Sequence, residues 1–125
     1  MDAKNSISHR PTPCCQGAPA VPSDVRACAA DLAPVCRALG DATRLQIAAL
    51  LARAEGYLCA CEIEAHFALA QPTISHHLQV LRKAGLVETE RRGTWIHYRL
   101  RSEAAQAMRS LAVLVCGTRN QGDIP

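Results

Sequence analysis

The segment from Gln71 to Val87 constrains the fold of this chain more than any other. Its apolar residues Ile74, Leu78 and Leu81 recur at helical spacing, so this face needs a hydrophobic core. The opposite face offers small polar and basic side chains, and Gly85 follows where the helix should end. A short helix that buries one face and presents hydrogen-bonding groups on the other fits the major groove of duplex DNA.

Two longer helices are expected at the start of the domain. The first begins near Ser23, a plausible N-cap, and runs towards Leu39, with Pro34 causing a kink or a break into two pieces. Asp41 then caps a second helix over residues 42–54. The apolar pattern of this second helix predicts an inward face of Leu45, Ala48, Ala49 and either Leu51 or Ala52.

Shorter elements surround the Gln71 helix. A third helix is predicted over residues 60–67. After the Gln71 helix, strands over residues 86–90 and 95–100 should form a hairpin, because Gly93 in the 91–94 turn supplies a permissive backbone. Ser102 caps a last helix over residues 103–116, whose inward face includes Ala104 and Val115.

Together these elements predict a mainly α fold with a small β-hairpin, a winged helix-turn-helix. The first and last helices carry more small apolar residues than so small a domain needs, which predicts dimerisation through them. A dimer would place two recognition helices about one DNA turn apart. The expected organisation is a flexible, proline-rich arm (residues 1–22), the DNA-binding and dimerisation domain (23–117) and a disordered tail (118–125).

The charge distribution supports a nucleic-acid partner. The chain of 125 residues has a net charge of only +3, but residues 82–101 contain six basic and two acidic side chains. Aromatic residues are only 3%, which argues against single-strand binding by base stacking. His77 is expected to pack or cap, and Trp95 to pack in the core or the hairpin. The predicted DNA contacts are Gln71, Thr73, Ser75, His76 and Gln79 in the helix, with Arg82, Lys83, Arg91, Arg92 and Thr94 at its end and in the wing.

Cysteine usage points to a second property. Seven cysteines occur in a chain that has neither a signal-peptide pattern nor a membrane-spanning run, so we expect a cytoplasmic protein with reduced thiols. Metal binding or thiol chemistry is then favoured over disulfides. Cys59 and Cys61 start the third helix, where the helix dipole favours a thiolate. An enzyme is not expected, because the spacing is Cys-x-Cys and no nucleophile–base set accompanies it.

Four motifs together resemble the ArsR/SmtB family of metal-sensing bacterial repressors, across residues 39 to about 100. They are Ala38–Leu45, Leu58–Ile63, Gln71–Leu78 and Arg91–Tyr98. The arsenical-resistance repressors are the most similar branch. The resemblance implies a homodimer that leaves double-stranded operator DNA when an inducer binds, with no further cofactor and no membrane partner.

The resemblance also implies where the inducer binds. In the family, Cys-x-Cys at this helix start is an inducer site, and some members add thiols from an N-terminal arm. One common arsenical pattern has a further cysteine where this chain has Glu64. The predicted ligands are therefore Cys59 and Cys61 with one or both of Cys14 and Cys15. The last helix contains no histidine, which disfavours the family's zinc site there.

The identity of the signal stays open between two hypotheses. The first inducer class is trivalent arsenic or antimony, which take three sulfur ligands. The alternative keeps the fold and the DNA binding but responds to cadmium or lead, which also favour sulfur, or to thiol oxidation.

Overall fold

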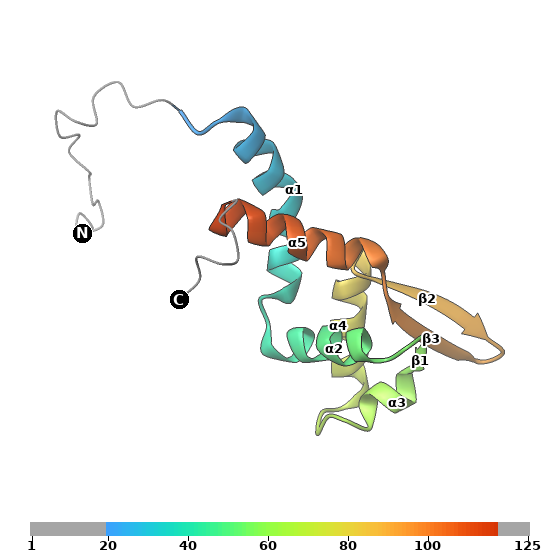
Figure 1. Ribbon diagram of the computed structural model, residues 1–125. Coiled ribbons are helices and arrows are strands. Elements are labelled where there is room, and N and C mark those ends of the chain that lie inside the picture. Colours follow the sequence, from blue (N-terminus) through green and yellow to red (C-terminus); the bar gives the residue numbers. More distant parts are fainter. Residues whose placement is uncertain (1–19, 118–125) are drawn as a thin grey trace, which may run out of the picture.

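The computed structural model describes residues 20–117. The predicted mainly α fold with a small antiparallel sheet is confirmed (Figure 1). Residues 1–19 and 118–125, and with them Cys14 and Cys15, lie outside the described residues. No helix within residues 20–117 is long and apolar enough to cross a membrane. The elements in chain order are α1 (Ser23–Leu39), α2 (Ala42–Arg53), β1 (Leu58–Cys59), α3 (Ala60–Glu64), α4 (Gln71–Lys83), β2 (Val87–Arg92), β3 (Trp95–Leu100) and α5 (Ser102–Cys116).

The first two helices test the proline and capping expectations. Of the kink or break predicted at Pro34, the break is wrong, because α1 is one continuous helix. Pro34 is exposed, so water can reach the carbonyl that its missing N–H leaves unpaired. Ser23 is the first helical residue rather than the N-cap. The Asp41 cap is confirmed: its Oδ2 accepts hydrogen bonds from the backbone N–H groups of Thr43 (2.9 Å) and Arg44 (3.1 Å).

The sheet has three strands instead of the predicted two. β1 pairs antiparallel with β3, placing Leu58 opposite Tyr98 and Cys59 opposite His97. β3 pairs in turn with β2, and the register continues to Arg92 opposite Trp95. The turn is therefore only Gly93 and Thr94, with Gly93 in the left-handed region at φ 66°. Figure 1 shows this β2–β3 hairpin, the wing, projecting away from the helices.

The core joins α2, α3, α4 and the base of the wing. Ile47, Ile63 and Leu81 are fully buried in it, and Val87 contributes from β2. The predicted inward face of α2 is partly wrong: Leu51 is buried as one of the predicted alternatives, but Ile47 is buried without having been predicted and Leu45 is 54% exposed.

Leu45 instead lines an apolar groove of about 370 Å³ between α2 and α5. Ala48, Ala49 and Met108 line the same groove. On α5, Ala104 is buried as predicted, but Val115 is 72% exposed. A single copy of the chain thus leaves part of its apolar surface open to solvent.

Candidate functional site

The two faces of α4 separate as its sequence predicts. Ile74, Leu78 and Leu81 are at most 1% exposed and lie in the core. The helix begins without a side-chain cap, and Pro72 occupies its first turn, where a missing N–H costs little. The face away from the core is open to solvent along the whole helix. Its exposed side chains include Gln71, Thr73, Ser75, His76, Gln79, Arg82 and Lys83.

A polar network ties α4 to the start of α2. The Arg44 side chain donates from Nε to the carbonyl of Ala38, and its Nη1 lies 3.3 Å from His77 Nδ1. The Asp41 carboxylate lies 3.9 Å from the same ring nitrogen. The backbone N–H of Arg44, more than any other group, lowers the pKa of Asp41. His77 is therefore a packed residue that orients α4, as expected, and not part of the exposed face.

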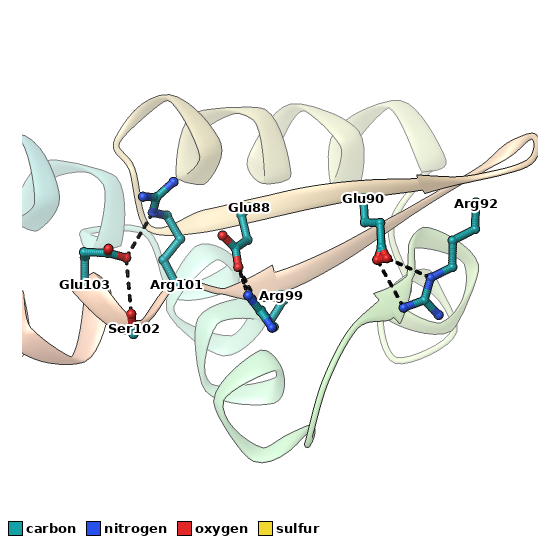
Figure 2. Close-up of polar contacts among 7 residues, drawn as sticks. All are labelled: Glu88, Glu90, Arg92, Arg99, Arg101, Ser102 and Glu103. Atoms are coloured by element: carbon teal, nitrogen blue, oxygen red, sulfur yellow. Dashed lines mark hydrogen bonds and ion pairs between the residues drawn. The ribbon is translucent and has the colours of Figure 1, made fainter.

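Ion pairs with glutamates neutralise much of the positive charge of the wing (Figure 2). Arg92 Nε lies 3.3 Å from Glu90 Oε1, and Arg99 Nε donates to Glu88 Oε1 at 2.8 Å. The Glu88 hydrogen bond is also the largest cause of the raised pKa of Arg99. Arg101 pairs with Glu103 at the start of α5.

Tyr57, which belongs to none of the sequence motifs, contacts two of these arginines. The guanidinium carbons of Arg92 and Arg99 lie 5.3 Å and 4.7 Å from the centre of the Tyr57 ring. Arg92 and Arg99 are both partnered, whereas Arg82, Lys83 and Arg91 form no ion pair within the described residues.

Alternation along β2 separates its two terminal arginines. Arg91 shares a sheet face with Val87, which joins the core containing Leu78 of α4. Arg92 lies on the opposite face, over Tyr57. The structure therefore separates the predicted wing contacts. Within residues 20–117, Arg91 forms no ion pair and lies on the same sheet face as the core, whereas Arg92 pairs with Glu90 on the other face.

Trp95 lies outside the core. Its side chain is 59% exposed at the first position of β3, opposite Arg92, and the neighbouring Ile96 is 40% exposed opposite Arg91. Of the two predicted positions, packing in the core is wrong, because the core ends nearer the base of the hairpin, at Val87 and Leu100. Packing on the hairpin stays a prediction.

The thiol pair lies where β1 passes into α3. Cys59 is 7% exposed and Cys61 is exposed, yet their Sγ atoms are only 2.9 Å apart. The backbone N–H of Cys59 donates to Glu62 Oε1 at 2.9 Å, which fixes the start of α3. Opposite Cys59 in the sheet, the buried Nδ1 of His97 has no hydrogen-bond partner within the described residues.

The protonation of Cys61 differs from the sequence expectation. Its pKa is raised, first by the hydrogen bond that its thiol donates to Cys59 Sγ and then by desolvation. The expected preference for a thiolate is therefore not met at Cys61, because a partner thiol outweighs the start of a five-residue helix. No group of three His, Cys, Asp or Glu side chains within residues 20–117 is placed to hold a metal ion.

Comparison with protein families gives one match for this part of the chain. Residues 41–89 match the model described as bacterial regulatory protein, arsR family. This segment contains the Asp41 cap, the thiol pair, α4 and the start of the wing.

Similar proteins of known name carry related descriptions. The chain is 46% identical over 72 residues to the arsenic resistance transcriptional regulator ArsR1 of Pseudomonas putida, covering 58% of this chain and 56% of that protein. It is 34% identical over 87 residues to the arsenical resistance operon repressor of Bacillus subtilis, covering 70% of this chain and 81% of that protein. The chain thus spans little more than half the length of the Pseudomonas relative.

One solved structure extends the likeness beyond the matched segment. The homodimeric winged helix-turn-helix DNA-binding domain Mb0332 of Mycobacterium bovis is 29% identical. The match covers 86% of this chain and 97% of that chain with a TM-score of 0.58. It supports the arrangement of helices and wing described above.

Proposed function

Because the chain belongs to the arsR family of bacterial regulatory proteins, we propose that it is a homodimeric transcriptional repressor released from operator DNA by trivalent arsenic or antimony. The observation that carries the proposal is the thiol pair in β1 and α3, directly before a helix with an open polar face. The names of the Pseudomonas and Bacillus relatives support arsenic as the signal.

The DNA surface consists of the open face of α4 and the near part of the wing. α4 enters the major groove, where its small polar side chains reach base edges and its basic end reaches phosphates. Arg91 supplies the free positive charge of the wing. The proposed base-contacting residues are Gln71, Thr73, Ser75, His76 and Gln79, and the proposed phosphate contacts are Arg82, Lys83, Arg91, Arg92 and Thr94.

A second copy of the chain covers the apolar surface of α1, α5 and the α2–α5 groove. The groove is almost wholly apolar, and Leu45 and Val113 are each more than half exposed. The homodimeric state of the Mycobacterium domain supports this pairing. Two copies of α4 then contact two half-sites on one face of the duplex.

Cysteine thiolates coordinate the inducer. Cys59 and Cys61 provide two sulfur ligands on adjoining elements, and the 2.9 Å separation of their Sγ atoms supports binding of both to one ion. Trivalent arsenic takes three sulfurs, so a third must come from elsewhere. We assign it to Cys14 or Cys15, which lie outside the described residues. Binding of arsenite breaks the hydrogen bond that the Cys61 thiol donates to Cys59, and each thiol proton leaves with a displaced hydroxide as water.

The thiol pair is connected to both DNA-contacting elements. α3 precedes α4 in the helix-turn-helix, and Cys59 itself is part of the sheet through its pairing with His97 of β3. An ion that draws the two sulfurs towards the arm therefore displaces the wing as well as α4. Induction is then a coupling free energy: the ion binds more tightly to the conformation whose α4 and wing no longer match the two half-sites.

The test uses a fluorescein-labelled duplex that the full chain has selected from a randomised pool. Arsenite should release the wild-type protein from this duplex. Cys59→Ser and Cys61→Ser should bind the duplex normally and fail to respond, while Cys116→Ser, at the exposed end of α5, should respond normally. Cys14→Ser and Cys15→Ser identify the third ligand by which of them also loses the response.

The same assay separates the competing signals. Cadmium, lead and peroxide are titrated in parallel with arsenite. Release by one of these without release by arsenite would replace the arsenic proposal with the corresponding metal or redox signal. A folded Cys59→Ser protein that no longer binds the duplex would contradict the separation of the sensor from the DNA surface.

A further inference from the structure

The tip of the wing combines exposed apolar and cationic side chains. Trp95 is 59% exposed and Ile96 is 40% exposed, and as neighbours in β3 they point to opposite faces of the hairpin. The register places Arg92 opposite Trp95 and Arg91 opposite Ile96. Each face of the tip therefore presents one arginine and one large apolar side chain, beside a turn of only two residues.

Folding does not account for the position of Trp95. The core ends at Val87 and Leu100, near the base of the hairpin. Arg92 stacks on Tyr57, so the tyrosine and not the indole is its aromatic partner. Figure 1 also shows the wing projecting away from α1, which forms one part of the proposed dimer contact. The core of the described residues leaves the indole uncovered.

Duplex DNA offers a surface that matches this tip. The sugar walls of the minor groove lie between two rows of phosphates, and apolar side chains can insert between its base steps. The exposed indole of Trp95 can contact the sugars and bases of the groove, while the arginines on both faces of the hairpin lie close to its phosphates. We propose that Trp95 contacts the minor groove beside the α4 site and contributes affinity that does not depend on ion pairing. This inference rests on the proposed DNA binding.

Trp95 can serve as an intrinsic fluorescence probe, because it is the only tryptophan in the sequence. Titrating the full chain with unlabelled selected duplex should change the emission of the indole and reduce its quenching by acrylamide. Trp95→Ala should weaken binding at least about fivefold, as expected for the loss of one base–aromatic contact, with an unchanged dependence on salt. Trp95→Phe should recover most of the affinity.

The outcomes separate this inference from the proposed function. If labelled duplex shows no anisotropy change with the wild-type protein, both are overturned. If the duplex binds but the indole emission and its acrylamide quenching do not change, only the role of Trp95 is overturned. If Trp95→Ala instead lowers the melting temperature and leaves duplex affinity unchanged, Trp95 serves the hairpin and not DNA.

Discussion

Replacing Arg91 by alanine should reduce the salt dependence of duplex binding, whereas replacing Arg99 should change it little. Arg91 has no ion-pair partner within the described residues, while Arg99 is held by Glu88 and stacks on Tyr57. Each lysine or arginine that neutralises a phosphate adds about 0.9 to the slope of log K against log salt. A dimer has two wings, so the expected reduction for Arg91→Ala is about 1.8.

That change in slope corresponds to a measurable difference in affinity. Over a fourfold rise in salt concentration, the wild-type protein should lose about 12-fold more affinity than Arg91→Ala. The measurement is fluorescence anisotropy with the selected duplex at four or five potassium chloride concentrations. Arg99→Ala is the matched control, since it removes the same charge from the same hairpin.

Two results would refute the reasoning. Equal losses of slope for both variants would mean that Glu88 does not hold Arg99 away from phosphates. An unchanged slope for Arg91→Ala, in a protein that still binds the duplex, would place the wing away from the DNA. In the first case, formal charge along the strand would predict the salt dependence as well as the ion pairs do.

Two further predictions concern stability. Asp41→Asn keeps a capping side chain but removes its charge. Folding lowers the pKa of Asp41 from its ordinary value of 3.8, so the charged form stabilises the fold at pH 7. Urea unfolding should therefore show a higher free energy of unfolding for the wild-type protein at pH 7, and this difference should disappear as the pH falls below 3.8. Leu78→Ala should lower the free energy of unfolding by about 3 kcal/mol, because this side chain is 1% exposed in the core. Leu69→Ala, at a 43% exposed position, is the control and should change the free energy of unfolding by less than about 0.5 kcal/mol. Equal effects would contradict the assignment of Leu78 to the core.

Much of the helix-turn-helix was predictable because its signals are local. The spacing of Ile74, Leu78 and Leu81 alone defines the buried face of α4, and Asp41 caps α2 through groups two and three residues away. α2 itself was harder, because apolar residues occur around most of its circumference. Without an opposing element, the sequence could not distinguish Ile47, which is buried, from Leu45, which lines the groove.

The candidate site was also predictable only in part. The motif of Cys59 and Cys61 and the polar face of α4 are visible in the sequence. Strand β1 was missed because two residues have no periodicity, and only their pairing with β3 makes them a strand. The predicted ligands Cys14 and Cys15 lie outside the described residues, so their role stays a prediction.

The sequence by itself determined which segments form α4 and the wing, since helix periodicity, caps and a glycine turn act over a few residues. Only the tertiary structure decided which charges and apolar groups remain available. The antiparallel register places Glu88 beside Arg99, and the end of the core leaves Trp95 exposed. These outcomes depend on residues that are distant in the chain, and formal charge or hydropathy counted along the sequence does not contain them.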